Sequence, residues 1–265
     1  MYPHHRETIE KIRDAFAVQD DILAVLLGGS VAHGFCTDTS DVDIMLIVSE
    51  DEYVKRRDAD QLLYWDNALS TYEGGYVDGK YVSLDFLKKV RERGSEPARF
   101  AFQDARIILS RIEGLRELLA DIPRYPVEGK EMRLARFYAQ LEAWKWYFAE
   151  AMRHDIGYLR HMAVAKLILF GGRLILTHNE MLYPYHKWFL RVLSDAADKP
   201  VGLMGQIDNL LKDASMENVE AFYHSIDDFR QWVDDDISFG QSWGQFFMCD
   251  SELNWLTGHT PVDDL

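Results

Sequence analysis

The spacing of hydrophobic residues in the first half of the chain alternates between the period of a helix and the continuous runs of buried strands. Apolar residues recur every three or four positions in some segments, as on one face of an amphipathic helix. Elsewhere they form unbroken runs that are typical of buried strands. The elements predicted in this way are helices over 7–19, 50–69 and 112–119 and strands over 22–27, 42–48 and 105–109. The mixture indicates an α+β fold, with a small mixed β-sheet flanked by helices.

A further pair of strands is predicted around the dipeptide Asp78-Gly79. This dipeptide favours a tight β-hairpin turn when apolar and aromatic residues flank it, as they do from Tyr76 to Val82. The return strand is expected to run from Tyr81 to Phe86. It would carry Asp85 on a strand of the sheet.

Strand patterns end near Pro123 and Pro126, which mark the expected domain boundary. Beyond them apolar residues keep a helical spacing. Further amphipathic stretches lie around 186–194, 203–212, 216–235 and 241–255. We therefore predict two domains: residues 1–125 with the mixed sheet, and residues 126–265 as an all-α bundle of about five helices.

Composition limits the classes of protein to which this chain can belong. The chain has 265 residues and a formal net charge of −15, which argues against a dedicated nucleic-acid binder, because phosphate backbones attract an excess of Lys and Arg. Its two cysteines, Cys36 and Cys249, are too few for a disulfide framework or a four-cysteine zinc site. The start of the chain lacks the apolar run of a signal peptide, and there is no apolar stretch of membrane-spanning length. We expect a soluble, cytoplasmic protein, a monomer or homodimer.

The charge is unevenly distributed along the chain. Residues 130–191 carry an excess of basic groups, whereas residues 192–265 are strongly acidic and include Asp227, Asp228 and the run Asp234, Asp235 and Asp236. A basic segment suits a domain that contacts a triphosphate. If the acidic residues line a cleft, they favour a cationic substrate.

The segment from Leu27 to Asp43 carries the strongest chemical signal. A strand ending in Gly28, Gly29 and Ser30 and turning into a helix exposes backbone N–H groups to an anion, and the glycines let phosphate oxygens approach the backbone. Asp41 and Asp43 lie two positions apart on the next strand, so their carboxylates share one face. Paired carboxylates beside a phosphate-binding turn suit Mg²⁺.

These residues resemble the signature of the DNA polymerase beta-like nucleotidyltransferases: an apolar residue, Gly-Gly or Gly-Ser, about ten further residues, Asp-apolar-Asp-apolar, and a third Asp on a later strand. The resemblance implies that Asp41, Asp43 and Asp85 are catalytic and hold two Mg²⁺ ions. It implies that Gly28, Gly29 and Ser30 bind a nucleoside triphosphate, with ATP as the expected donor. A nucleoside monophosphate would then pass to an acceptor hydroxyl, with release of pyrophosphate.

The later helices resemble, more loosely, the second domain of the kanamycin and lincosamide nucleotidyltransferases. A motif of Asn179, Tyr183, Pro184, Lys187 and Trp188 is similar to one in bacterial members with that bundle. The resemblance implies a small-molecule acceptor, for example an antibiotic, bound in a cleft between the domains. Because Val31 stands where many members have Arg, Lys187 is expected to contact the triphosphate, and Arg173 or His33 could supply further phosphate contacts.

Three questions stay open at the level of the sequence. The general base could be Asp85, Glu142 or Glu180. The chain could instead modify a protein by AMPylation, as an antitoxin-type enzyme, or act as a non-catalytic nucleotide-binding partner. A remote alternative is an α/β hydrolase with Ser30 as its nucleophile, since residues 28–32 fall one glycine short of the Gly-x-Ser-x-Gly motif.

Overall fold

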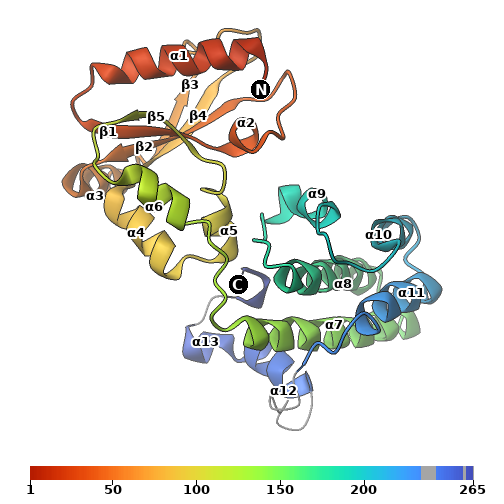
Figure 1. Cartoon of the computed structure of the whole chain (residues 1–265). Helices are drawn as coiled ribbons and strands as arrows, with labels where there is room; N and C mark the ends of the chain where they lie inside the picture. Colours follow the sequence, from red (N-terminus) through yellow and green to blue (C-terminus); the bar gives the residue numbers. More distant parts are fainter. Residues whose placement is uncertain (234–242, 259–260, 265) are drawn as a thin grey trace. The chain divides into compact units, whose positions relative to one another are not determined.

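A computed structural model describes residues 1–233, 243–258 and 261–264, and it divides the chain into two compact units, Met1–Arg124 and Tyr125–Leu265 (Figure 1). The N-terminal unit contains a five-stranded mixed sheet, whereas the described part of the C-terminal unit is helical. The chain is therefore α+β, as the hydrophobic pattern predicts. Each unit is described by itself below.

The sheet of the N-terminal unit has the strand order β3-β4-β2-β1-β5. In this sheet β2 and β4 are parallel, and the other three neighbouring pairs are antiparallel. The strands are β1 (Ile22–Leu27), β2 (Val42–Val48), β3 (Leu63–Asp66), β4 (Val77–Ser83) and β5 (Arg106–Ser110). Since β1 ends where β2 and β4 begin, the last residues of β1 and the first residues of β2 and β4 meet at one edge of the sheet.

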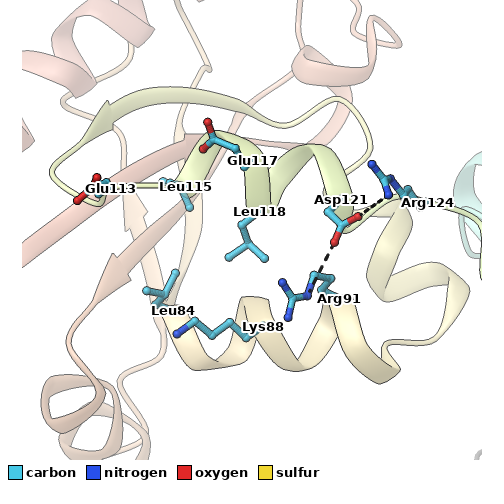
Figure 2. A pocket seen from close by; sticks show the side chains of 10 residues that line it. Leu84, Lys88, Arg91, Glu113, Leu115, Glu117, Leu118, Asp121 and Arg124 are labelled. Carbon is cyan, nitrogen blue, oxygen red and sulfur yellow. Dashed lines mark ion pairs between the residues drawn. The ribbon is translucent and has the colours of Figure 1, made fainter.

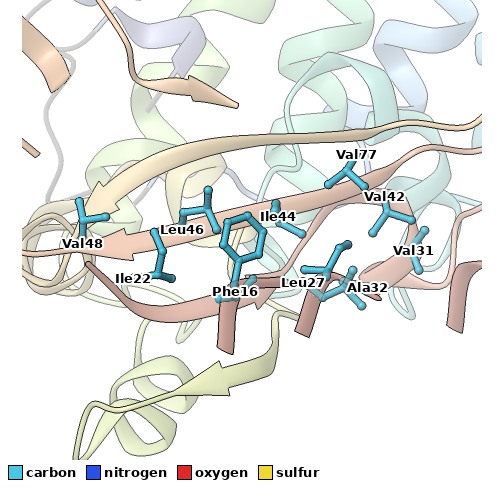
Figure 3. Packing of buried hydrophobic residues seen from close by; sticks show 12 residues of the cluster. Phe16, Ile22, Leu27, Val31, Ala32, Val42, Ile44, Leu46, Val48 and Val77 are labelled. Carbon is cyan, nitrogen blue, oxygen red and sulfur yellow. The ribbon is translucent and has the colours of Figure 1, made fainter. Parts of the chain in front are cut away.

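Helices cover both faces of this sheet. They are α1 (Pro3–Ala17), α2 (Gly29–His33), α3 (Glu50–Asp58), α4 (Leu84–Arg93), α5 (Glu96–Phe100) and α6 (Leu115–Asp121). Ile12 and Phe16 of α1 pack against one face, in a cluster with Ile44 and other buried strand residues (Figure 3). Residues of α4 and α6 pack on the other face, against Met45 and Ile47. The alternation of side chains along β2 thus fills two separate cores, which explains its unbroken apolar run.

Two sequence predictions in this unit are wrong. The helix predicted over 50–69 ends at Asp58, and the end of that segment is strand β3, which pairs with β4. The hairpin turn predicted at Asp78-Gly79 does not exist, because β4 runs straight through both residues. Gly79 instead permits close packing of β4 on β2: a Cβ at this position would lie 2.8 Å from the carbonyl oxygen of Ile44.

The C-terminal unit is built around α7 (Lys130–Arg153) and α8 (Gly157–His178). The remaining described helical segments are η1 (His186–Trp188), α9 (Phe189–Ser194), α10 (Leu203–Lys212), α11 (Met216–Asp227), α12 (Trp243–Phe247), η2 (Met248–Glu252), α13 (Asn254–Thr257) and η3 (Val262–Asp264). Gly171 and Gly172 of α8 leave room for the rings of Phe222 and Phe189, so their role is close packing.

Two helices predicted for this unit differ in the structure, and one predicted acidic run lies outside the described residues. The helix expected over 216–235 ends at Asp227, and the one expected over 241–255 is divided into shorter segments in its described part. Asp234, Asp235 and Asp236, which would favour a cationic substrate if they lined a cleft, lie outside the described residues. Among the helices that the structure describes, none has the length and apolar character needed to cross a membrane.

Candidate active site

The turn between β1 and α2 is built on two glycines. The backbone N–H of Gly28 donates to the carbonyl oxygen of Asp43 at 2.9 Å, which joins the turn to the start of β2. Gly29 has a φ of +58°, and a Cβ there would lie only 1.7 Å from an Asp43 carboxylate oxygen. The turn therefore requires glycine at position 29 for two reasons, backbone conformation and close approach to a carboxylate.

Ser30 adds a polar atom to this turn. Its side chain is buried, with 7% exposure, and its Oγ has no hydrogen-bond partner among the residues that the structure describes. A buried hydroxyl without a partner costs free energy unless a ligand satisfies it. The same observation argues against Ser30 as a hydrolase nucleophile, which needs a general base within hydrogen-bond reach.

Three carboxylates meet beside the turn. Oxygen atoms of Asp41, Asp43 and Asp78 all lie within 4.8 Å of one another. Asp43 and Asp78 are directly paired across β2 and β4, and Asp41 immediately precedes β2. Side chains of paired residues share a face of the sheet, so the topology itself brings these groups together. Hard oxygen ligands at this separation fit one or two Mg²⁺ ions.

Asp85, expected to be the third carboxylate, lies elsewhere. It is in the first turn of α4, where Ser83 caps the helix by accepting a hydrogen bond from the N–H of Phe86, and its carboxylate pairs with Lys89 at 2.7 Å. From Asp78 the strand runs about 16 Å to Ser83, away from the cluster. Asp78 takes the position predicted for Asp85. A sequence signal for the helical position of Asp85 is Ser83 with an acidic residue two positions later, which marks a helix start rather than a strand.

The loop that precedes Asp41 is held from two sides. Nε2–H of His5, which is fully buried, donates to the carbonyl oxygen of Ser40 at 3.0 Å, and the Tyr72 hydroxyl donates to the same oxygen. Burial lowers the pKa of His5 and raises that of Tyr72. Residues far apart in sequence thus fix the backbone next to a cluster carboxylate, and the local sequence around each of them gives no sign of this contact.

Tyr76 lies at the edge of the cluster. The charge of the neighbouring Asp41 carboxylate, to which the hydroxyl is also hydrogen-bonded, raises the pKa of Tyr76. The phenol of Tyr76 therefore stays protonated beside this carboxylate. The sequence pattern predicts Tyr76 only as part of a hairpin.

His33, weighed as a phosphate contact, has other contacts. Its Nδ1 lies 2.9 Å from a carboxylate oxygen of Asp104, and its ring stacks on Phe100 with the centroids 4.6 Å apart. Only 4% of the His33 side chain is exposed. It therefore links α2 to α5 and the residues that follow α5.

The two basic residues of the C-terminal unit expected at the triphosphate, Lys187 and Arg173, contact aromatic rings of their own unit. Lys187 is exposed in η1, with its Nζ 5.0 Å from the ring centroid of Trp188, so its contact with the triphosphate stays a prediction. Arg173 is fully buried between the rings of Phe137 and Tyr183.

The two helical carboxylates weighed as general bases already have partners. Glu142 accepts a hydrogen bond from the hydroxyl of Tyr223, and Glu180 pairs with Lys130 at 2.9 Å.

Other hollows and clusters are less suited to this chemistry. A hollow of about 490 Å³ between α4 and α6 is lined by charges of both signs, and its Asp121 already pairs with Arg91 and Arg124 (Figure 2). It includes Leu84, so it lies beyond the end of β4 opposite to Asp78. In the helical unit, carboxylate and imidazole groups also converge at the end of α11, outside the domain that carries the glycine turn; they belong to His224, Asp227 and Asp228.

A match to a protein-family model agrees with this geometry. Residues 9–108 match the family model of the nucleotidyltransferase domain, a span that includes β1, the glycine turn and all three carboxylates. No curated protein matches the chain. A similar solved structure is a nucleotidyltransferase-like protein from Exiguobacterium sibiricum 255-15, with 12% identity, coverage of 85% of this chain and 73% of that one, and a TM-score of 0.44. The family match and the site within it show that residues 9–108 form a nucleotidyltransferase domain of the DNA polymerase beta-like superfamily.

Proposed function

We propose that this protein transfers a nucleoside monophosphate from a nucleoside triphosphate, with ATP as the preferred donor, to a hydroxyl group of a small-molecule acceptor. The observation that carries the proposal is the convergence of Asp41, Asp43 and Asp78 within 4.8 Å, directly beside a turn with an unsatisfied buried hydroxyl. Nucleotidyl transfer itself follows from the family. The donor, the acceptor class, the metal and the residue roles are our proposal.

The turn would bind the triphosphate. Backbone N–H groups at the start of α2 and the Ser30 hydroxyl are the donors available for the β and γ phosphates. Gly29 lets those phosphates lie against the backbone next to Asp43. Binding supplies the partner that the buried hydroxyl lacks, which is why we assign Ser30 a nucleotide contact.

The three carboxylates would hold Mg²⁺. When bound, the ions neutralise charge on the phosphates and on the attacking oxygen. Asp41, immediately before β2, and Asp43, near its start, would hold the ions beside the phosphates, and Asp78 would complete the site from β4. The protonated hydroxyl of Tyr76, close to Asp41, would be a hydrogen-bond donor to that carboxylate. Asp85 has no place in this assignment.

The proposed reaction is an in-line substitution at the α phosphorus. The acceptor oxygen forms a new bond to phosphorus, the bond from phosphorus to the β-phosphate bridging oxygen breaks, and pyrophosphate leaves. The acceptor proton passes to a carboxylate of the cluster, with Asp78 as the candidate because it lies on the side away from the glycine turn. Positioning and charge neutralisation supply most of the acceleration.

We further propose that residues 126–265 bind the acceptor, with the basic segment 130–191 contacting the nucleotide through Lys187. The excess of basic groups in segment 130–191 supports a contact between that segment and the nucleotide. A kanamycin-like or lincosamide-like antibiotic is one acceptor of the proposed class.

The proposal is tested by calorimetry and by a transfer assay. Wild-type protein is expected to bind ATP in the presence of Mg²⁺, and Asp43→Asn is expected to lose that binding while the far-ultraviolet circular dichroism stays unchanged. With α-labelled ATP, label should move to an acceptor among aminoglycosides and lincosamides. Wild-type protein that binds no nucleotide with metal present would refute the proposal.

A further inference from the structure

Two exposed aromatic side chains lie beside the carboxylate cluster. Trp65 of β3 is 62% exposed and Tyr76 is 36% exposed, and their ring centroids are 6.2 Å apart with planes inclined by 34°. We propose that these two rings form one wall of the acceptor subsite, supplied by the N-terminal unit, and that Trp65 stacks on an acceptor bearing a flat, apolar ring face. This inference rests on the proposed function and names the chemistry of its second substrate.

The register of the sheet places Trp65 next to the cluster. Trp65 is directly paired with Asp78 across β3 and β4, and Asp78 is directly paired with Asp43 across β4 and β2. Paired side chains share a face, so these three groups form a row across the strands. Tyr76 lies two residues before Asp78 and therefore points to the same face. With neighbouring strands about 4.8 Å apart, Trp65 lies about 10 Å from the backbone of Asp43.

The glycine turn and Trp65 lie on opposite sides of β2, and this order fits the geometry of the transfer reaction. The glycine turn follows β1, which borders β2 on one side, and β3 and β4 lie on the other side of β2. In an in-line transfer the attacking oxygen approaches opposite to the leaving pyrophosphate. With the phosphates at the turn beside Gly29, the acceptor enters from the side of Asp78. Trp65 lies on that side, immediately beyond Asp78.

The chemistry of this wall selects the kind of acceptor. An exposed indole presents a broad apolar face at a small entropic cost, which makes Trp and Tyr frequent anchors of binding sites. Leu63, 83% exposed and also on β3, extends the apolar strip along the same strand. A flat apolar face of this kind belongs to a pyranose ring or to an aromatic ring, and the shared requirement is that face beside a reactive hydroxyl.

Nuclear magnetic resonance of indole-labelled protein tests the contact directly. The protein is saturated with Mg²⁺ and α,β-methylene-ATP and titrated with kanamycin, lincomycin, N-acetyltyrosinamide or glycerol; Trp65→Phe identifies the Trp65 resonance by its loss. A ring-bearing probe is expected to shift that resonance, and glycerol, which has no ring, is expected not to. The sugar and aromatic probes distinguish the two sources of a ring face. If no ring-bearing probe shifts the resonance, the inference is overturned.

Variants of Trp65 separate acceptor binding from nucleotide binding. Trp65→Ala is expected to weaken binding of the active probe about tenfold, as loss of one stacked ring does, while Trp65→Phe retains most of the affinity. Neither variant should change the affinity for α,β-methylene-ATP with Mg²⁺ by more than about twofold. A tenfold loss of nucleotide affinity in Trp65→Ala would mean that the ring stacks on the nucleobase, and would overturn the inference. Wild-type protein that binds no nucleotide would refute the proposed function instead.

Discussion

Substitution of Gly29 by alanine tests whether the glycine turn and the carboxylate cluster form one site. The change adds a single methyl group. At this position the new Cβ would lie 1.7 Å from a carboxylate oxygen of Asp43, whereas Cβ atoms essentially never approach another heavy atom closer than 3.0 Å. The carboxylate or the turn must therefore move by more than about 1 Å.

The size of the effect follows from two separate costs. A left-handed conformation costs a non-glycine residue about 1–2 kcal/mol, and the φ of +58° at Gly29 incurs that cost. Gly34 has a φ of +74°, but a Cβ at Gly34 would meet no described atom within 4 Å, so Gly34→Ala incurs the backbone cost alone. The left-handed backbone conformation should therefore destabilise Gly29→Ala and Gly34→Ala by similar amounts. Gly29→Ala alone displaces Asp43.

Calorimetric titration with ATP and Mg²⁺ separates the two costs, with urea unfolding as the measure of stability. Gly34→Ala is expected to lose about 1–2 kcal/mol of stability and to keep its nucleotide affinity within about threefold. Gly29→Ala is expected to lose nucleotide binding and to be at least as destabilised. Wild-type affinity for the metal and nucleotide in a folded Gly29→Ala protein would refute the claim that the turn and Asp43 act together.

Three further predictions concern single groups. Asp78→Asn should abolish transfer of α-labelled nucleotide, whereas Asp85→Asn, which loses only an exposed pair with Lys89, should transfer at a rate close to that of wild type; the reverse pattern would show that the third ligand is misassigned. Ser30→Ala removes a hydroxyl that has no partner among the described residues, so urea unfolding should detect no loss of stability while calorimetry shows nucleotide affinity reduced about tenfold; unchanged affinity would exclude the phosphate contact. Burial lowers the pKa of His5 below its ordinary 6.5, so the unfolded chain takes up a proton that the folded chain resists. Stability should therefore be complete above about pH 6.5 and fall as the pH drops below it, and the fall in urea midpoint should be smaller in His5→Gln; an equal fall in both proteins would contradict the role of His5.

Strands β1 and β2 and the paired carboxylates could be predicted because their signals are local. The apolar runs that became β1 and β2 are fixed by burial on both faces, and their predicted bounds match the structure. The glycine turn follows directly from β1. Asp41 and Asp43 lie on one face because side chains alternate along a strand.

The third carboxylate could not be predicted because it depends on pairing between distant strands. Asp78-Gly79 is a strong turn signal when read alone, but the parallel pairing of β4 with β2 overrides it. Ser83 then caps helix α4, which begins at Leu84, so Asp85 lies in that helix and not in the sheet. The strand that carries Trp65 could not be predicted for the same reason. The segment after Asp58 continues a helical pattern, and its pairing with β4 makes it strand β3.

The position of bound metal tests the central claim most directly. Crystals grown with Mn²⁺ and α,β-methylene-ATP are expected to show anomalous density among the carboxylates of Asp41, Asp43 and Asp78, with the triphosphate against Gly29 and Ser30. The same experiment on Asp43→Asn is expected to show neither metal nor nucleotide at this edge of the sheet. Nucleotide bound elsewhere, or Mn²⁺ held at Asp85 while the three-carboxylate cluster stays empty, would contradict the account.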